Sequence, residues 1–186
     1  MARKSKTAEF FGRKAEAVAQ NLLGKTIERY VAGSSEPLRA RIVVTGAYEG
    51  LTGNRKEQEG MLSAPGGLYI MKVRGFYSLN FGTESAEKPS VVCIIGVQIA
   101  KQSGLELLIG PGKVAAQLGI DEAFNGLKLD EVPDLAIVGR AVPAARRIIV
   151  AEGTRLGTGR SANSVRYSSN CTAIYALADL VKPMER

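Results

Sequence analysis

Two dense runs of β-branched residues constrain the fold more than any other feature of the sequence. "RIVVTGAYEG" spans residues 41–50, and "SVVCIIGVQI" spans residues 90–99. Short runs of this kind, bounded by glycines and polar turns, are typical of β-strands. In the first run Gly46 and Tyr48 follow the β-branched stretch, so the end of this strand is expected at a surface.

The rest of the chain predicts more strands and two helices. Residues 25–33 and 38–48 predict a β-hairpin, and residues 68–82 predict strand structure with a sharp bend at Gly75. Helical spacing predicts a helix over residues 8–24, and Gly110-Pro111 predicts the start of a second one that ends near Gly119. Three further β-like runs cover residues 134–142, 146–152 and 164–174.

The length and the pattern predict one domain of the α+β class. The 186 residues fit a single domain, and the chain has neither an internal repeat nor a low-complexity linker. We expect a mostly antiparallel sheet with helices packed outside it. The predicted boundaries are a basic N-terminal tail over 1–7, the domain over 8–178 and a C-terminal tail over 179–186.

The charge balance favours a polyanionic partner. The net charge is +7 at pH 7, and nucleic acid is the usual partner of such a chain, although a basic protein with a merely solvated surface is the alternative. There is no apolar run of about 18 residues and no signal-peptide pattern, so we expect no membrane contact. The expected location is the cytoplasm or the nucleoid.

The absence of histidine excludes several chemistries. Ser-His-Asp and Cys-His catalysis cannot operate, so acid–base work would fall to Asp, Glu, Lys, Tyr or water. Cys93 and Cys171 are the only cysteines, and two distant thiols without histidine give too few soft ligands for a metal. We expect no metal site.

Basic residues at three places are candidate phosphate contacts. Lys113 lies in "GPGK", which lacks the spacing of a nucleoside-triphosphate loop but suits one phosphate at a helix start. Arg74 precedes the bend at Gly75. Arginines also gather in the last third of the chain, and a solvated face is the alternative interpretation of all these groups. That cluster comprises Arg140, Arg146, Arg147, Arg155, Arg160 and Arg166.

Several segments together resemble the alkyladenine (3-methyladenine) DNA glycosylases of the mammalian and Bacillus type. They are "EFFGRKAEAVAQNLLGKTIER", "RARIVVTGAY", "APGGLYIMKVRGFYSLN", "IGPGKVAAQLGID" and "SVRYSSNCTAI", and they occur in the family's order from about residue 8 to 174. The resemblance implies one domain with a curved, open-barrel-like sheet and surrounding helices. It also implies base flipping, a tyrosine wedge in the duplex, a glutamate that deprotonates the attacking water, and no cofactor.

Carried over residue by residue, the resemblance retains the scaffold but loses much of the chemistry. The catalytic glutamate falls on Gly46, and an earlier glutamate falls on Val44. Tyr48 retains a base-pocket tyrosine, while a second stacking tyrosine falls on Met71. The pocket asparagine of the family matches Asn80, the wedging tyrosine falls on Arg74, and the glycine beside it is kept as Gly75. An arginine of the family falls on Gly96, and its phosphate-contacting lysine is retained as Lys113.

Three functions remain open from the sequence. The first is a degenerate family member that binds nucleic acid, with duplex DNA as the expected partner and RNA as the alternative, as a monomer, and with little or no N-glycosylase activity. The second is an active glycosylase with a relocated carboxylate, for which Glu49 is the candidate, with Glu57 and Glu59 as further ones. The third is a non-catalytic structural or assembly protein.

Overall fold

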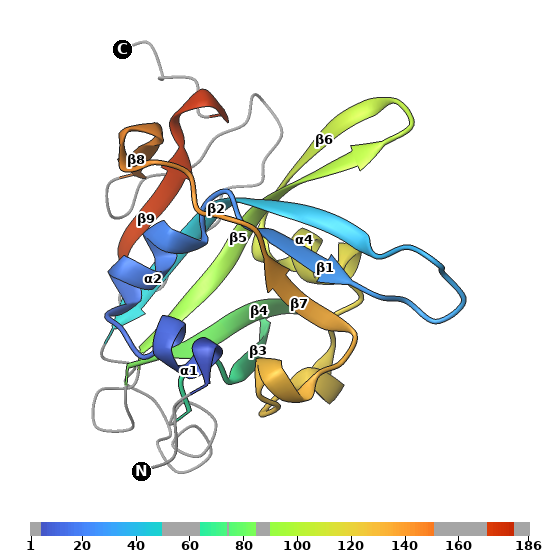
Figure 1. Ribbon diagram of the computed structural model, residues 1–186, viewed down its shortest axis with the longest axis horizontal. Helices are drawn as coiled ribbons and strands as arrows, with labels where there is room; N and C mark the ends of the chain where they lie inside the picture. The colour runs from blue at the N-terminus through green and yellow to red at the C-terminus, as the bar shows by residue number, and fades with distance from the viewer. Residues whose placement is uncertain (1–4, 50–63, 74, 85–89, 151–170, 181–186) are drawn as a thin grey trace.

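Two twelve-residue strands, β2 (Leu38–Glu49) and β5 (Ser90–Lys101), pair antiparallel at the centre of the structure (Figure 1). They are the two β-branched runs that dominate the sequence. The computed structural model describes residues 5–49, 64–73, 75–84, 90–150 and 171–180. Most of the polar, glycine-rich stretch over residues 50–67 lies outside this part.

β2 and β5 pair with each other along one edge. Along its other edge each pairs with two shorter strands, which curls the sheet. β5 pairs with β4 (Phe76–Thr83) along its first half and with β6 (Gly104–Ile109) along its second. β2 pairs with β1 (Thr26–Arg29) and then with β9 (Cys171–Leu177). The β2–β5 register shifts on both sides of Val44, and such bulges increase the local twist. The curled sheet confirms the predicted α+β fold with an open-barrel-like sheet.

The remaining strands also pair antiparallel. β3 (Leu68–Val73) pairs with β4, β7 (Leu135–Val138) with β1, and β8 (Arg147–Val150) with β9. The predicted hairpin is confirmed as β1–β2, and the predicted bend lies in the loop between β3 and β4. β6 is an edge strand with no fully buried side chain, and its sequence did not predict a strand.

The helix expected over residues 8–24 is in fact two helices, so its predicted continuity is wrong. α1 (Lys6–Phe11) ends at Gly12, whose N–H donates to the Ala8 carbonyl, and α2 (Ala15–Leu22) starts after an extended residue, Lys14. The break lets both helices direct apolar side chains to the sheet. Phe11, for example, stacks on Phe81 of β4 with the two ring centroids 5.1 Å apart.

The second predicted helix is confirmed as α4 (Pro111–Gln117), with proline in its first turn and Gly119 at a φ of 60° after its end. Short 3-10 helices follow, which the sequence analysis did not predict. They are η1 (Glu122–Phe124), η2 (Leu129–Glu131), η3 (Ala144–Arg146) and η4 (Ala178–Leu180).

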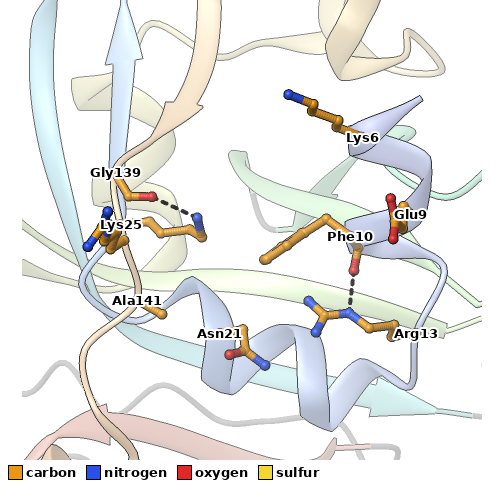
Figure 2. A pocket seen from close by; sticks show the side chains of 9 residues that line it. Lys6, Glu9, Phe10, Arg13, Asn21, Lys25, Gly139 and Ala141 are labelled. Carbon is orange, nitrogen blue, oxygen red and sulfur yellow. Dashed lines mark hydrogen bonds between the residues drawn. The ribbon is translucent and has the colours of Figure 1, made fainter.

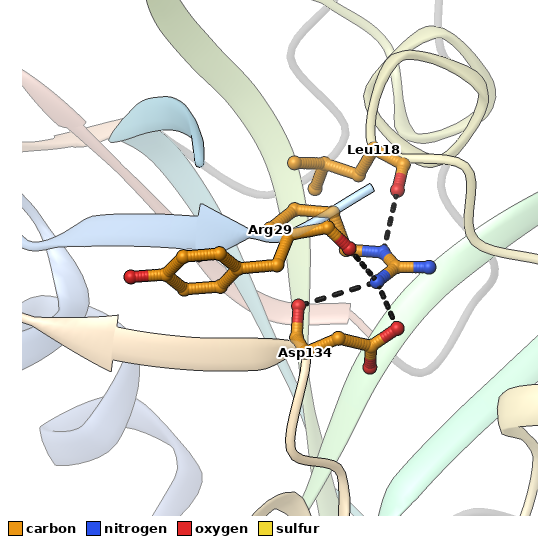
Figure 3. Close-up of polar contacts among 4 residues, drawn as sticks. Arg29, Leu118 and Asp134 are labelled. Carbon is orange, nitrogen blue, oxygen red and sulfur yellow. Dashed lines mark hydrogen bonds and ion pairs between the residues drawn. The ribbon is translucent and has the colours of Figure 1, made fainter. Parts of the chain in front are cut away.

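One largely buried arginine fixes the C-terminal end of α4 to the sheet (Figure 3). Arg29 of β1 donates from Nε to the Leu118 carbonyl at 3.1 Å and from Nη1 to the Asp134 carbonyl at 3.2 Å. It also forms an ion pair with the Asp134 carboxylate. These contacts join α4, β1 and the start of β7, and they hold the helix that carries Lys113.

None of the helices in the described ranges has the length and apolar composition needed to cross a membrane.

Candidate functional site

The side chains at the end of β2 alternate between two faces of the sheet. Thr45 is fully buried and donates from Oγ1 to the Ala19 carbonyl of α2 at 2.9 Å. Gly46 and Tyr48 therefore face the opposite side, because neighbouring residues of a strand point to opposite faces. We call these two sides the α2 face and the Gly46 face.

The strand register brings the predicted base-pocket positions onto the Gly46 face. Gly46 pairs with Cys93 of β5, and Cys93 pairs with Asn80 of β4. Met71 of β3 pairs with Ser78, two residues before Asn80. Directly paired residues share a face, so Gly46, Tyr48, Met71 and Asn80 lie on one side of the curled sheet. They come from β2 and from the β3–β4 hairpin.

The space beside Gly46 is filled by neighbouring side chains. A Cβ atom built on Gly46 would lie 2.8 Å from Cδ1 of Ile95 and 3.0 Å from Cε2 of Tyr48. The Tyr48 hydroxyl would be 3.4 Å away. Both distances to carbon are shorter than ordinary van der Waals contact. A carboxylate at this position would therefore require Ile95 and the tyrosine ring to move.

Aliphatic packing also fills the position where the resemblance implies an arginine. A Cβ atom on Gly96 would lie 2.7 Å from Cδ1 of Ile109 and 3.0 Å from Cγ2 of Val44. Val44 itself stands where the resemblance implies a glutamate. The described side chains at these two positions are aliphatic, whereas the resemblance implies charged ones.

Asn80 is engaged by the protein itself. It is 3% exposed, and its Nδ2 atom donates to the Tyr69 carbonyl at 2.8 Å and to the carbonyl and hydroxyl of Ser78 at 3.1 and 3.0 Å. These bonds give the residue a role in holding β3 and β4 together. Met71, by contrast, is 42% exposed.

Glu49, the candidate substitute acid, lies on the α2 face. The register of β2 with β5 is unbroken from Thr45 to Glu49, which pairs with Ser90, whereas its register with β9 shifts between Ala47 and Tyr48. The odd-numbered residues at this end of the strand point toward α2. The pKa of Tyr175 supports this placement: burial raises it, and the charges of Glu16 on α2 and of Glu49 raise it further. Glu57 and Glu59 lie outside the described residues.

The β3–β4 hairpin and the start of α4 form a surface at the edge of the Gly46 face. Gly75, at a φ of 84°, is in the two-residue loop between the strands, and Arg74 lies outside the described residues. Phe76 is 67% exposed, and a Cβ atom on Gly112 would be 3.0 Å from its Cβ. Lys113 follows Gly112 and is exposed. The sequence analysis missed Phe76, although an aromatic residue directly after the bend was a usable signal.

Two of the described arginines in the last third of the chain, Arg146 and Arg147, bond to other groups of the protein. Arg146 forms an ion pair with Asp179. Arg147 donates from Nε to the Val142 carbonyl at 2.9 Å. Arg140 is exposed, whereas Arg155, Arg160 and Arg166 lie outside the described residues. No group of three or more Cys, Asp or Glu side chains in the described part could hold a metal ion.

Comparison with known proteins shows which family the chain is similar to. The family model for methylpurine-DNA glycosylase matches residues 9–170. A Rhodopseudomonas palustris protein is 33% identical over 172 residues, which cover 82% of this chain and 80% of that protein. A Rickettsia rickettsii protein is 31% identical over 78% of this chain and 83% of its own length. Both carry names that provisionally call them 3-methyladenine DNA glycosylases. The mouse DNA-3-methyladenine glycosylase is 26% identical over 82% of this chain and 54% of its own length.

Proposed function

This chain belongs to the methylpurine-DNA glycosylase family. We propose that it binds duplex DNA, as the family implies, but has little or no N-glycosylase activity. The observation that carries the proposal is the filled space at Gly46. Ile95 and Tyr48 occupy the room that an acid side chain would need.

The chemistry of base excision supports this proposal. Cleavage of an N-glycosidic bond by water needs a group that takes the proton of the water, and glycine has none. Losing such a group costs about 10²–10⁴-fold in rate. Glu49 points toward α2, away from the space where a water beside Gly46 would attack. An apolar lining at Val44, Ile95 and Ile109 gives a charged transition state no stabilisation.

The surface at the edge of the Gly46 face supports DNA binding. Phe76 presents an exposed ring at a hairpin tip, and apolar side chains of this kind insert between base steps in the minor groove. Lys113 stands beside it as a phosphate contact. The net charge of +7 attracts the backbone from a distance.

Two binding measurements test the DNA role. Affinity for a plain duplex should fall with added salt, because each neutralised phosphate releases counterions. Lys113→Ala should weaken binding and reduce the slope of log K against log salt by about 0.9. Lys128→Ala is the matched control, because Lys128 is exposed at the start of η2 and pairs with Glu131. An equal effect of both variants, or no binding at low salt, would remove the support for this surface.

Competition with an RNA duplex of the same sequence tests the choice of nucleic acid. The proposal expects DNA to compete better, because a residue that wedges between base steps acts in the minor groove of bendable B-form DNA. Preference for RNA would instead assign the basic surface to an RNA partner. Binding to neither would favour a structural or assembly role.

A further inference from the structure

A basic groove lies beside α1 and α2, and Figure 2 shows the side chains that line it. Its volume is about 510 Å³, and it is open to solvent between α1, α2 and residues 139–141. Volumes of about 300–1,000 Å³ are typical of small-molecule sites. Four cationic residues line it, together with Phe10 and one carboxylate residue, Glu9. The cations are Lys6, Arg13, Lys25 and Arg140.

The cations of the groove lack carboxylate partners within the part of the chain that the structure describes. The ion pairs found among the described residues use Arg29, Arg39, Lys101, Lys128 and Arg146. None of the four groove cations is in an ion pair with a carboxylate of the described part. Four like charges at one groove repel one another, and a bound anion is the simplest way to offset that repulsion.

Two of the cations are held in place against an aromatic ring. Cζ of Arg13 lies 4.7 Å, and Nζ of Lys25 lies 5.2 Å, from the centroid of Phe10. Arg13 donates from Nε to the Phe10 carbonyl at 2.8 Å, and Lys25 donates from Nζ to the Gly139 carbonyl at 2.9 Å. Each bond uses one donor and leaves other N–H groups of the same side chain for a ligand. The site is therefore pre-organised.

Partial burial and the neighbouring charge of Arg13 both disfavour the charged form of Lys25. Burial and then the charge of Arg13 lower the pKa of Lys25. An anion placed between the two side chains would favour the charged form of the lysine. The geometry and the charge thus point to the same class of ligand.

We propose that this groove binds a phosphate group, as a phosphate mono- or diester. Arginine and lysine donors together suit phosphate oxygens. The volume exceeds that of a phosphate alone and admits an attached nucleoside. The phosphate belongs either to a free nucleotide or to a nucleic-acid strand other than the one at α4.

The test follows the amide NMR spectrum of the isotope-labelled full-length chain during titration with inorganic phosphate, a nucleoside monophosphate and a short oligothymidylate. Saturable shifts are expected at Phe10, Arg13, Lys25 and Arg140. Arg13→Gln together with Lys25→Met should weaken the binding at least about tenfold, since bonds to charged groups are lost. Arg140→Gln, on an exposed side chain, is the second variant in case the double variant does not fold. Lys113→Ala should leave the groove shifts unchanged.

Each outcome decides the proposal. Saturation by phosphate or the monophosphate supports a free ligand, and saturation by the oligothymidylate alone supports a strand. No shift in the groove at up to about 10 mM of any probe would overturn it. So would shifts that persist in both variants. Lys113→Ala changes only the α4 surface, so it should weaken DNA binding and leave the groove shifts in place. Failure of the proposed DNA binding and failure of the groove proposal therefore give different results.

Discussion

At the scale of single residues, Gly46 is the position on which the proposed loss of glycosylase activity depends. The sequence predicted that the acid of the family falls on a glycine, and this could be read from the ordered motifs around it. Ile95 could not be found in the same way, because its place beside Gly46 follows only once the pairing of Gly46 with Cys93 is known. Register shifts depend on the pairing of strands and are not visible in one strand alone.

A double-mutant cycle tests the packing at this position. Gly46→Ala should destabilise the protein by about 1 kcal/mol, because its methyl group meets Cδ1 of Ile95. Ile95→Val removes that atom, so the alanine should cost less in the Ile95→Val background, with a coupling of about 0.5–1 kcal/mol. Urea unfolding measures both costs. Ile94→Val, a neighbour on the other face, should give no coupling, and additive effects with Ile95→Val would contradict the contact.

The raised pKa of Tyr175 predicts a dependence on pH. A phenol whose folded pKa lies above its unfolded value of about 10 binds its proton more tightly in the folded state. Its contribution to stability is therefore complete below about pH 10 and is lost as the pH rises through the folded pKa. Tyr175→Phe should flatten the fall in the free energy of unfolding above this pH. Tyr30→Phe, on an exposed ring, is the control, and an unchanged slope in Tyr175→Phe would refute the assignment.

At the scale of elements, the sequence predicted the strands and helices with strong local patterns. β1, β2, β5 and α4 followed from β-branched runs, a proline start and a glycine end. The break between α1 and α2 did not, because apolar residues at helical spacing continue across Gly12. β6 was missed because pairing with β5, more than its own sequence, makes it a strand.

The anchoring of α4 by Arg29 is a prediction at this scale. Arg29→Lys should destabilise the protein by about 1–2 kcal/mol, because an ammonium group cannot reach the Leu118 and Asp134 carbonyls together. Amide hydrogen exchange at Val114 and Leu118 should become faster. Arg39→Lys is the control, since this exposed side chain forms its ion pair with Glu28 and lies away from α4. Equal exchange rates in both variants would show that α4 does not depend on Arg29.

The β3–β4 hairpin supplies a second prediction. Phe76→Ala should weaken duplex binding by about tenfold, through loss of a ring that stacks on bases, without lowering the salt slope. Leu105→Ala is the matched control, because Leu105 is 70% exposed in a different hairpin, β5–β6. Fluorescence anisotropy with a labelled duplex measures both. Equal losses in the two variants would remove Phe76 from the binding surface.

At the scale of the whole molecule, a scaffold of the glycosylase family has a glycine, Gly46, where the resemblance implies the catalytic acid. The order of the motifs predicted the fold and the family. Strand register places Gly46, Tyr48, Met71 and Asn80 on one face, and their role as a base pocket stays a prediction. The sequence could not show how the space at Gly46 and Gly96 is filled, since that depends on side chains from β5 and β6. Nor could it show the groove beside α1 and α2, where Lys25 and Arg140 meet through folding alone.

The most direct test of the central claim is excision from a hypoxanthine-containing duplex, measured as abasic sites under single-turnover conditions with protein in excess. We predict no more product than in buffer, under the same conditions in which the protein binds the duplex. Abasic sites above the buffer control, from wild-type protein, would contradict the claim and would require a carboxylate to reach the Gly46 face.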